Sequence, residues 1–238
     1  MPSWSSSASL PYMGVKLVTY FPHNSSQNLP GIHGSYTLFS STTGQTLASM
    51  DGTVLTLYRT SSVLGLGSKI LARDDSQVLI MVGSGALAPH LIKSHLAVKP
   101  RVIIWNRTYQ KAKDLAETLS MDAQLKEISF ESHGSLDEII PLGDIISCSK
   151  NSTVPLVKER ECVCDNNTAM VEVGELVGAF ERGVIKKEDI CGYLVELIKG
   201  DKEGRKSSTE IMVFQSVGSG TVDLLTAQLV HETYLSPF

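Results

Sequence analysis

The middle of the chain alternates between short, wholly hydrophobic runs and longer amphipathic segments. Val78–Val82 is apolar throughout and Val102–Asn106 begins apolar, as is typical of strands buried on both faces of a sheet. Helical spacing of apolar positions follows each run, over Ala86–Ala97 and Gln110–Leu119. This alternation predicts βαβ units, and therefore a parallel sheet with helices on its faces. It continues through a weak strand at Glu127–Phe130, a helix at Leu136–Ile140 and a strand at Asp144–Cys148.

The first third of the chain has a different pattern. Gly14–Phe21 carries apolar residues on both faces, so we expect a buried strand there. Two strand-like runs around a polar turn, Tyr36–Ser40 and Gln45–Met50, predict a hairpin, and Thr53–Ala72 is helical in outline. The polar break Arg73–Ser76 then predicts a domain boundary.

The last third returns to short strands and helices. We expect two helices to end at Gly183 and Gly200, because glycine suits the left-handed cap of a helix. The predicted strands are Glu161–Cys164 and Ile211–Gln215, and the predicted helices are Glu175–Arg182, Lys187–Lys199 and Thr221–Tyr234. The fold class expected from these patterns is α/β.

Composition narrows the class of protein. The 238 residues carry 21 Lys+Arg against 25 Asp+Glu, a formal charge of −4, without the basic stripe that a nucleic-acid partner needs. The apolar runs are too short to span a membrane. Four cysteines are too few for a disulfide framework and lack the spacing of a zinc site, so we expect reduced thiols, no metal and an intracellular location, cytoplasmic or plastid stroma, without a targeting segment.

A glycine-rich turn follows the first strand of the predicted parallel sheet. Gly83-Ser84-Gly85-Ala86-Leu87-Ala88 has the form Gly-x-Gly-x-x-Ala between a strand and a helix. Glycines at these positions allow a tight turn and let backbone N–H groups approach a pyrophosphate at the helix N-terminus. The turn therefore predicts a dinucleotide site of Rossmann type. A strand-to-helix turn without a ligand is the alternative.

The end of the next strand indicates which dinucleotide binds. NAD sites place a carboxylate there for the ribose 2′-hydroxyl, but this chain has Asn106-Arg107-Thr108. The guanidinium of Arg107 suits a 2′-phosphate, with Asn106 and Thr108 as further donors, so the predicted cofactor is NADP(H). Alternatively, Arg107 is a solvated surface charge and the tripeptide only caps the next helix.

These two motifs occur with others in a fixed order. They are Lys16-Leu17-Val18-Thr19, Met50-Asp51-Gly52 with Arg59-Thr60, Val82–Ala86, Ile104–Thr108 and Ser216-Val217-Gly218. Together they resemble the ornithine cyclodeaminase/mu-crystallin family, most closely its plant reductases that form pipecolate from dehydropipecolate. The resemblance implies a partial α+β domain for substrate binding and dimerisation (1–75), a Rossmann domain (76–218) and a last helix returning to the first domain (219–238).

The resemblance also implies roles for single residues. Lys16 would lie near the substrate, Arg59 would hold its carboxylate and His33 would approach the cofactor from the first domain. The residues implied to bind the dinucleotide are Gly83, Ser84, Gly85, Ala86, Leu87, Asn106, Arg107, Thr108, Ser147, Ser149 and Val217.

The residue types alone leave other interpretations open. A lysine in an apolar strand needs an anionic partner such as a substrate carboxylate, but it also occurs on edge strands, where it prevents aggregation. Arg59 near a helix start is usually an exposed ion pair, and His33 is usually a loop histidine. Glu172 and Glu175 are candidates to orient a substrate amine, although surface carboxylates are commoner.

The chain also departs from the family pattern. It starts late, so a segment with a second carboxylate-binding arginine and much of the dimer interface is expected to be missing. Residues 157–165 are too few for a strand, a loop with the catalytic acid/base and a helix, which the family has there. We therefore expect weak or no activity and poor solubility.

Three functions remain in competition. The first is an NADP(H)-dependent reductase that converts a cyclic imine to pipecolate or proline; for this function the resemblance implies a place in lysine catabolism linked to plant defence. The second is a non-catalytic NADPH-dependent protein that binds a small carboxylate, as mu-crystallin does. The third is an ornithine cyclodeaminase, against which the missing carboxylate at position 106 counts.

Overall fold

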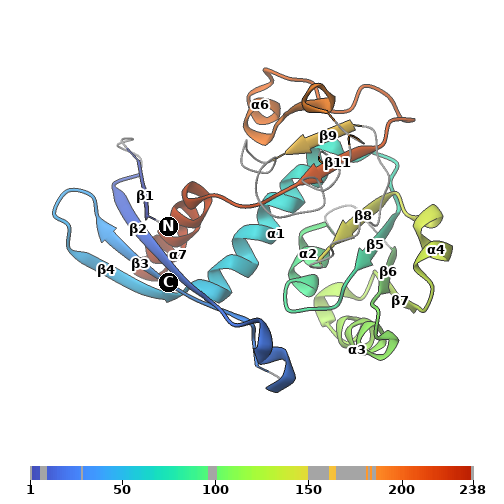
Figure 1. Ribbon diagram of the computed structural model, residues 1–238, viewed down its shortest axis with the longest axis horizontal. Helices are drawn as coiled ribbons and strands as arrows, with labels where there is room; N and C mark the ends of the chain where they lie inside the picture. The colour runs from blue at the N-terminus through green and yellow to red at the C-terminus, as the bar shows by residue number, and fades with distance from the viewer. Residues whose placement is uncertain are drawn as a thin grey trace. The chain divides into compact units, whose positions relative to one another are not determined.

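The chain forms two compact units in the computed structural model (Figure 1), which describes residues 2–5, 10–27, 29–95, 101–149, 161–164, 181, 183 and 186–236. The first unit combines Met1–Arg59 with Gly218–Phe238, and the second is Thr60–Val217. The division therefore lies between Arg59 and Thr60, within helix α1 (Gly52–Leu71), and not at the polar break near residue 75. Functional roles for the ranges 1–75, 76–218 and 219–238 stay predictions.

An antiparallel sheet, one long helix and the start of α1, up to Arg59, form the first unit. The sheet has the order β1 (Pro2–Trp4), β2 (Tyr12–Tyr20), β3 (Ile32–Ser40) and β4 (Thr46–Asp51). Helix α7 (Gly220–Leu235), from the other end of the chain, packs on β1, β2 and β3. The core between them contains Tyr36, Leu38, Leu55, Leu224 and Ala227.

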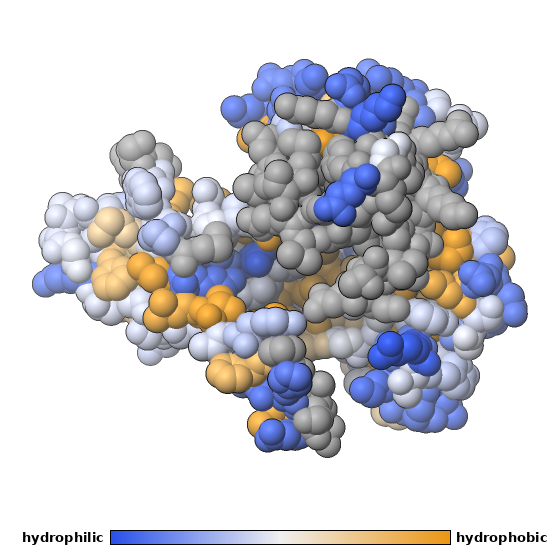
Figure 2. Space-filling view, in the orientation of Figure 1, coloured by the Kyte–Doolittle hydropathy of each residue, from blue (hydrophilic) through white to orange (hydrophobic). Residues whose placement is uncertain are grey.

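The strand predicted at Gly14–Phe21 is present, but the prediction that it is buried is wrong for its second half. Leu17, Val18 and Tyr20 are all more than half exposed. The reason is that β4 pairs with β3 only from Ser35 onward. A two-stranded arm, made of Val18–Tyr20 and Ile32–Gly34, therefore extends beyond the rest of the sheet. The arm ends in the 3-10 helix η1 (Pro22–Gln27), and Figure 2 shows hydrophobic side chains at the surface of this unit.

The Met-Asp-Gly motif has a local structural role. Oδ1 of Asp51 accepts hydrogen bonds from the backbone N–H groups of Thr53 (2.7 Å) and Val54 (3.0 Å) and so caps α1. These bonds lower the pKa of Asp51. A Cβ at Gly52 would lie 2.9 Å from backbone atoms of Gly34 and Ser35. The motif therefore fixes the start of the helix against the neighbouring strand.

A four-stranded parallel sheet forms the main part of the second unit, which confirms the predicted α/β class. Its order is β7 (Ser129–His133), β6 (Arg101–Trp105), β5 (Val78–Val82) and β8 (Ile145–Cys148). Three helices join these strands in turn: α2 (Ala88–His95), α3 (Tyr109–Ser120) and α4 (Leu136–Ile139). Short 3-10 turns, η3 (Ala123–Leu125) and η4 (Ile140–Leu142), complete the connections.

Both faces of this sheet are covered, which explains the uninterrupted hydrophobic runs. Leu79 and Met81 pack on one face with residues of α2 and α3. Ile80 and Val82 point to the other face and pack with Ile139 of α4. Successive residues of a strand point to opposite faces, so every position of β5 is apolar.

A second parallel sheet has the order β10 (Ile190–Tyr193), β9 (Glu161–Cys164) and β11 (Met212–Gln215). The single helix predicted over Lys187–Lys199 is wrong. The segment divides into a 3-10 turn η6 (Lys187–Asp189), β10 and a short helix α6 (Leu194–Lys199). Pairing of β10 with β9 overrides the local helical pattern. Gly200 does end α6 in the left-handed conformation, whereas the helix predicted at Glu175–Arg182 lies almost wholly outside the described residues.

Asp144 connects the start of the parallel sheet to the segment after α1. Its carboxylate accepts from the backbone N–H groups of Gln77 (2.8 Å) and Val78 (3.0 Å) and from Nη2 of Arg73 (2.6 Å). Burial raises the pKa of Asp144, but the hydrogen bonds and the Arg73 charge together have the larger effect. The pKa of Asp144 is therefore lowered.

We expect Asp144→Ala to destabilise the protein by about 2 kcal/mol at pH 7, because two backbone donors lose their acceptor. A carboxyl whose pKa is lowered on folding stabilises the native state above its unfolded pKa, near 4, and loses this effect as pH falls through the folded value. The difference between wild type and Asp144→Ala should therefore shrink below about pH 4. Urea unfolding at several pH values measures it; a difference that does not depend on pH would contradict the role of the charge.

Candidate functional site

Three of the segments predicted to bind the cofactor follow neighbouring strand ends at one edge of the parallel sheet. Val82, the last residue of β5, is in register with Trp105 of β6 and Cys148 of β8. The N–H of Gly83 donates to the carbonyl of Trp105 (2.8 Å), and the N–H of Ser149 donates to that of Val82 (2.9 Å). The glycine turn, the Asn106–Thr108 segment and Ser149 thus follow three neighbouring strand ends, where α/β proteins bind ligands.

The glycine turn has the features that a bound pyrophosphate requires. Gly83 has φ +115°, which side-chain-bearing residues rarely adopt. The backbone N–H groups of Ser84, Gly85 and Ala86 donate to no other residue that the structure describes. A Cβ at Gly85 would meet no atom of the described residues within 4 Å, so these residues leave space beside the turn. Oγ of Ser84 is buried yet has no hydrogen-bond partner among the described residues. These unsatisfied donors fit a phosphate ligand.

The segment after β6 leaves its arginine available. Arg107 and Thr108 are exposed, and Asn106 donates through Nδ2 to the carbonyl of Thr108 (3.1 Å). Thr108 is the N-cap residue of α3, but its side chain makes no capping hydrogen bond. No ion pair to Arg107 is found within the described part of the chain. The guanidinium and the Thr108 hydroxyl therefore have donors to spare for a ligand.

Other predicted cofactor residues have different surroundings. Ser147 in β8 is buried, and its Oγ lies 3.1 Å from Nε2 of His95 in α2. Val217 follows β11 in the second sheet, and His33 is an exposed residue of strand β3 in the first unit, not a loop residue. Contact of these three residues with a cofactor stays a prediction.

Lys16 is a buried member of an interior strand, so the interpretation as an edge-strand lysine is wrong. It is 7% exposed, and β2 has neighbours on both sides. Its Nζ donates to Oγ1 of Thr56 in α1 (2.6 Å) and to Oδ1 of Asp223 in α7 (3.1 Å). The anionic partner of this lysine is thus Asp223 of the last helix, whereas the sequence suggested a substrate carboxylate.

Arg59 contacts the same carboxylate oxygen, and the usual interpretation as an exposed ion pair is also wrong. Its Nε lies 3.1 Å from Oδ1 of Asp223, and its side chain is 12% exposed. The Nε–H does not form a hydrogen bond with that oxygen. Gly218, at φ +81°, makes room for the guanidinium, because a Cβ there would come within 2.1 Å of Nη1.

The buried cluster Lys16–Arg59–Asp223 carries two cations and one carboxylate. Burial lowers the pKa of Lys16 most strongly, Asp223 raises it and Arg59 lowers it. Sequence reasoning missed Asp223, because an acidic residue in the first turn of a helix is common and does not indicate a site. One uncompensated positive charge makes the cluster a candidate carboxylate site.

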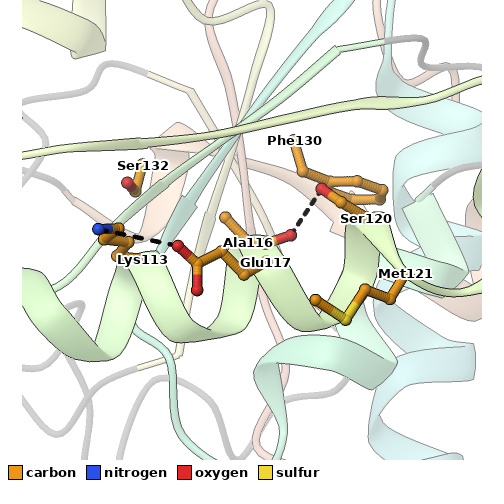
Figure 3. A pocket seen from close by; sticks show the side chains of 7 residues that line it. All are labelled: Lys113, Ala116, Glu117, Ser120, Met121, Phe130 and Ser132. Atoms are coloured by element: carbon orange, nitrogen blue, oxygen red, sulfur yellow. Dashed lines mark hydrogen bonds and ion pairs between the residues drawn. The ribbon is translucent and has the colours of Figure 1, made fainter.

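A separate groove of about 340 Å³ lies between α3 and β7 (Figure 3). Lys113 and Glu117 form an ion pair across its wall (3.8 Å), and Oγ of Ser120 donates to the carbonyl of Ala116 (2.8 Å). None of the residues singled out in the sequence lines it. Its polar side chains already have partners, since Oγ of Ser132 also donates to the hydroxyl of Tyr109 (3.3 Å), so we assign the groove no part in the site.

The described residues contain no group of three or more His, Cys, Asp or Glu side chains arranged to hold a metal ion. No described helix combines the length and the apolar character needed to cross a membrane. Glu172 and Glu175 lie outside the described residues.

Nearly the whole chain matches one family of known proteins. The profile of the ornithine cyclodeaminase/mu-crystallin family matches residues 1–160 and 153–237. The chain belongs to the ornithine cyclodeaminase/mu-crystallin family. It is 77% identical to Protein SAR DEFICIENT 4 of Arabidopsis thaliana over 268 positions, which cover 99% of this chain and 82% of that protein. It is 31% identical to a Δ1-pyrroline-2-carboxylate reductase of Colwellia psychrerythraea, over 98% of this chain and 82% of the relative.

Solved structures of similar fold contain a nicotinamide cofactor. A Thermococcus litoralis Δ1-pyrroline-2-carboxylate reductase in complex with NADH and L-proline has a TM-score of 0.88 and 24% identity, over 99% of this chain and 86% of that one. An archaeal alanine dehydrogenase dimer with bound NAD has a TM-score of 0.85 and 26% identity, over 95% and 78%. The predicted Rossmann-type class is thereby confirmed.

The alignment lengths bear on the expected internal deletion. The alignment with the Arabidopsis relative spans 268 positions, although this chain has 238 residues. The relative therefore has residues without a counterpart here. The family profile likewise matches in two pieces that meet at residues 153–160, next to the segment where the sequence predicts a missing strand and helix.

Proposed function

We propose that this protein is an NADP(H)-dependent reductase of cyclic imine carboxylates, with dehydropipecolate (piperideine-2-carboxylate) as substrate and pipecolate as product. The observation that carries the proposal is Arg107, an exposed guanidinium without an ion pair among the described residues, at the strand end beside the glycine turn. The names of the relatives support a cyclic imino acid as the substrate class.

The cofactor proposal combines the glycine turn with the arginine at the end of the next strand. The archaeal alanine dehydrogenase, similar in fold and 26% identical, holds NAD. A site for NAD uses a carboxylate after the second strand, and a carboxylate would repel a 2′-phosphate. This chain has Asn106, Arg107 and Thr108 there. We therefore favour NADP(H), whose 2′-phosphate offers a bidentate acceptor to the guanidinium.

When bound, the cofactor supplies a hydride to the imine carbon, and the substrate nitrogen takes part as the protonated iminium. The chain's own residues hold the substrate. The guanidinium of Arg59 binds its carboxylate, and Lys16 adds a second positive charge at the same site. Ser84 and the N–H groups of the glycine turn bind the pyrophosphate. The proton donor belongs to the segment that we expect this chain to lack.

The deciding experiment follows NADPH oxidation at 340 nm with piperideine-2-carboxylate and with pyrroline-2-carboxylate. Oxidation that depends on either imine supports the reductase. NADPH binding without turnover favours a carboxylate-binding protein. This alternative is favoured by the residues that the Arabidopsis relative has and this chain lacks. Ammonia release from ornithine would instead indicate a cyclodeaminase and overturn the proposal.

Arg107→Ala is expected to weaken NADPH binding roughly 30-fold and to leave NADH binding within about twofold, because only NADPH loses a charged contact. Fluorescence titration with each nucleotide measures both constants. Arg101→Ala is the matched control, since Arg101 pairs with Glu131 at 2.9 Å. Equal loss for the two nucleotides would contradict a contact with the 2′-phosphate.

A further inference from the structure

One carboxylate oxygen links residues from opposite ends of the chain. Oδ1 of Asp223 lies 3.1 Å from Nζ of Lys16 and 3.1 Å from Nε of Arg59. Asp223 is 2% exposed and the Lys16 side chain 8%, so neither has appreciable contact with water. Two buried cations that converge on one oxygen repel each other, and only the carboxylate makes their approach favourable.

The start of α7 is built to present this carboxylate. Ser219 caps the helix by accepting from the N–H of Val222 (3.3 Å), which places Asp223 in the first turn. Gly218, just before the cap, leaves space for the Arg59 guanidinium. The same short segment thus supplies both the counterion and the room for the second cation.

We propose that Asp223 is a positioning residue of the carboxylate site. It holds Lys16 and Arg59 together as charged groups and leaves one net positive charge for the carboxylate of a cyclic imino or amino acid. The inference rests on the proposed function for the identity of that ligand. The free donors of Arg59 support it, because no hydrogen bond to its terminal nitrogens is found among the described residues.

The charge balance predicts what happens without Asp223. Lys16 is faced by Asp223 from α7, by Arg59 and Thr56 from α1, and by Tyr36, its register partner in β3. Burial and Arg59 both lower the pKa of Lys16, and only Asp223 raises it. In Asp223→Asn the Lys16 ammonium should therefore lose its proton at a lower pH than in wild type, and an incoming carboxylate should restore that proton.

The test uses the full chain with NADP⁺ and L-pipecolate, and a ¹⁵N-lysine label. In Asp223→Asn we expect the Nζ resonance of Lys16 to titrate at least one pH unit lower than in wild type, and Asp223→Glu to restore most of the difference. Calorimetry in two buffers should detect proton uptake on L-pipecolate binding in Asp223→Asn alone. Because of this uptake, the affinity of Asp223→Asn for L-pipecolate should fall up to about tenfold for each unit by which the pH rises. Asp74→Asn, at an exposed position, is the charge-matched control.

An unchanged Lys16 titration in Asp223→Asn, or equal proton uptake in both proteins, would overturn the inference. If Asp223→Asn does not fold, the double variant Lys16→Met/Asp223→Asn decides: recovery of folding supports the inference, because the excess buried cation is gone, and failure to recover overturns it. A wild type that binds neither L-pipecolate nor L-proline, with a Lys16 titration that still depends on Asp223, would refute the proposed function and leave the charge-holding role of Asp223 intact.

Discussion

Gly85→Ala is expected to unfold at the wild-type temperature and to bind NADPH at least roughly 100-fold more weakly. The effect on stability and the effect on NADPH binding differ because of the space around this glycine. A Cβ at Gly85 meets no atom of the residues that the structure describes within 4 Å, and the φ of Gly85 is not positive, so alanine costs the fold little. The same Cβ would occupy the space in which the backbone must approach a pyrophosphate. Thermal unfolding and NADPH titration measure the two quantities.

Gly134→Ala is the matched control for this variant. Gly134 likewise has open space for a Cβ and no positive φ, but it follows β7 and is not part of the glycine turn. It should bind NADPH as wild type does. Undiminished NADPH affinity in Gly85→Ala would mean that the turn is only a strand-to-helix connection.

Arg59→Gln is expected to lower the affinity for L-pipecolate about 100-fold while NADPH binding stays unchanged. The substitution removes the charged fork that a carboxylate can engage with two hydrogen bonds. Folding should survive, because Asp223 keeps the hydrogen bond from Lys16 at 3.1 Å. Calorimetry with L-pipecolate in the presence of NADP⁺ provides the measurement.

Two controls test whether the loss of affinity is specific to the substrate carboxylate and to Arg59. Piperidine, which lacks the carboxylate, should bind wild type and Arg59→Gln equally weakly. Arg101→Gln removes the same charge from an exposed pair and should change nothing. An Arg59→Gln protein that binds L-pipecolate like wild type would show that another group holds the carboxylate.

The parallel sheet and its glycine turn could be predicted because the information is local. A strand buried on both faces must be apolar at every position, and every residue of β5 is apolar. A tight turn before a helix needs glycine where φ is positive, as at Gly83. The position of Arg107 beside the turn could be predicted because the carboxyl ends of neighbouring parallel strands, here β5 and β6, lie at the same edge of the sheet.

Predictions that depended on partners distant in the sequence were less successful. The arm Val18–Tyr20 is apolar yet exposed, because the length of β4 decides where the sheet ends. Residues 190–193 have a helical pattern but pair with β9, which lies far earlier in the chain. Periodicity describes which side of an element is apolar, and it does not say which neighbour that side meets.

The sequence by itself determined that a glycine-rich turn follows one strand and that an arginine, with no carboxylate, stands at the end of the next, since both features depend on adjacent residues. It also indicated that Lys16 needs an anion unless its strand lies at the edge of a sheet, because an ammonium in an apolar strand is unstable alone. Only the tertiary structure decided that Asp223, 207 positions away, is that anion and that Arg59 shares it. Ion pairing depends on distance in space, which no local pattern of residues records.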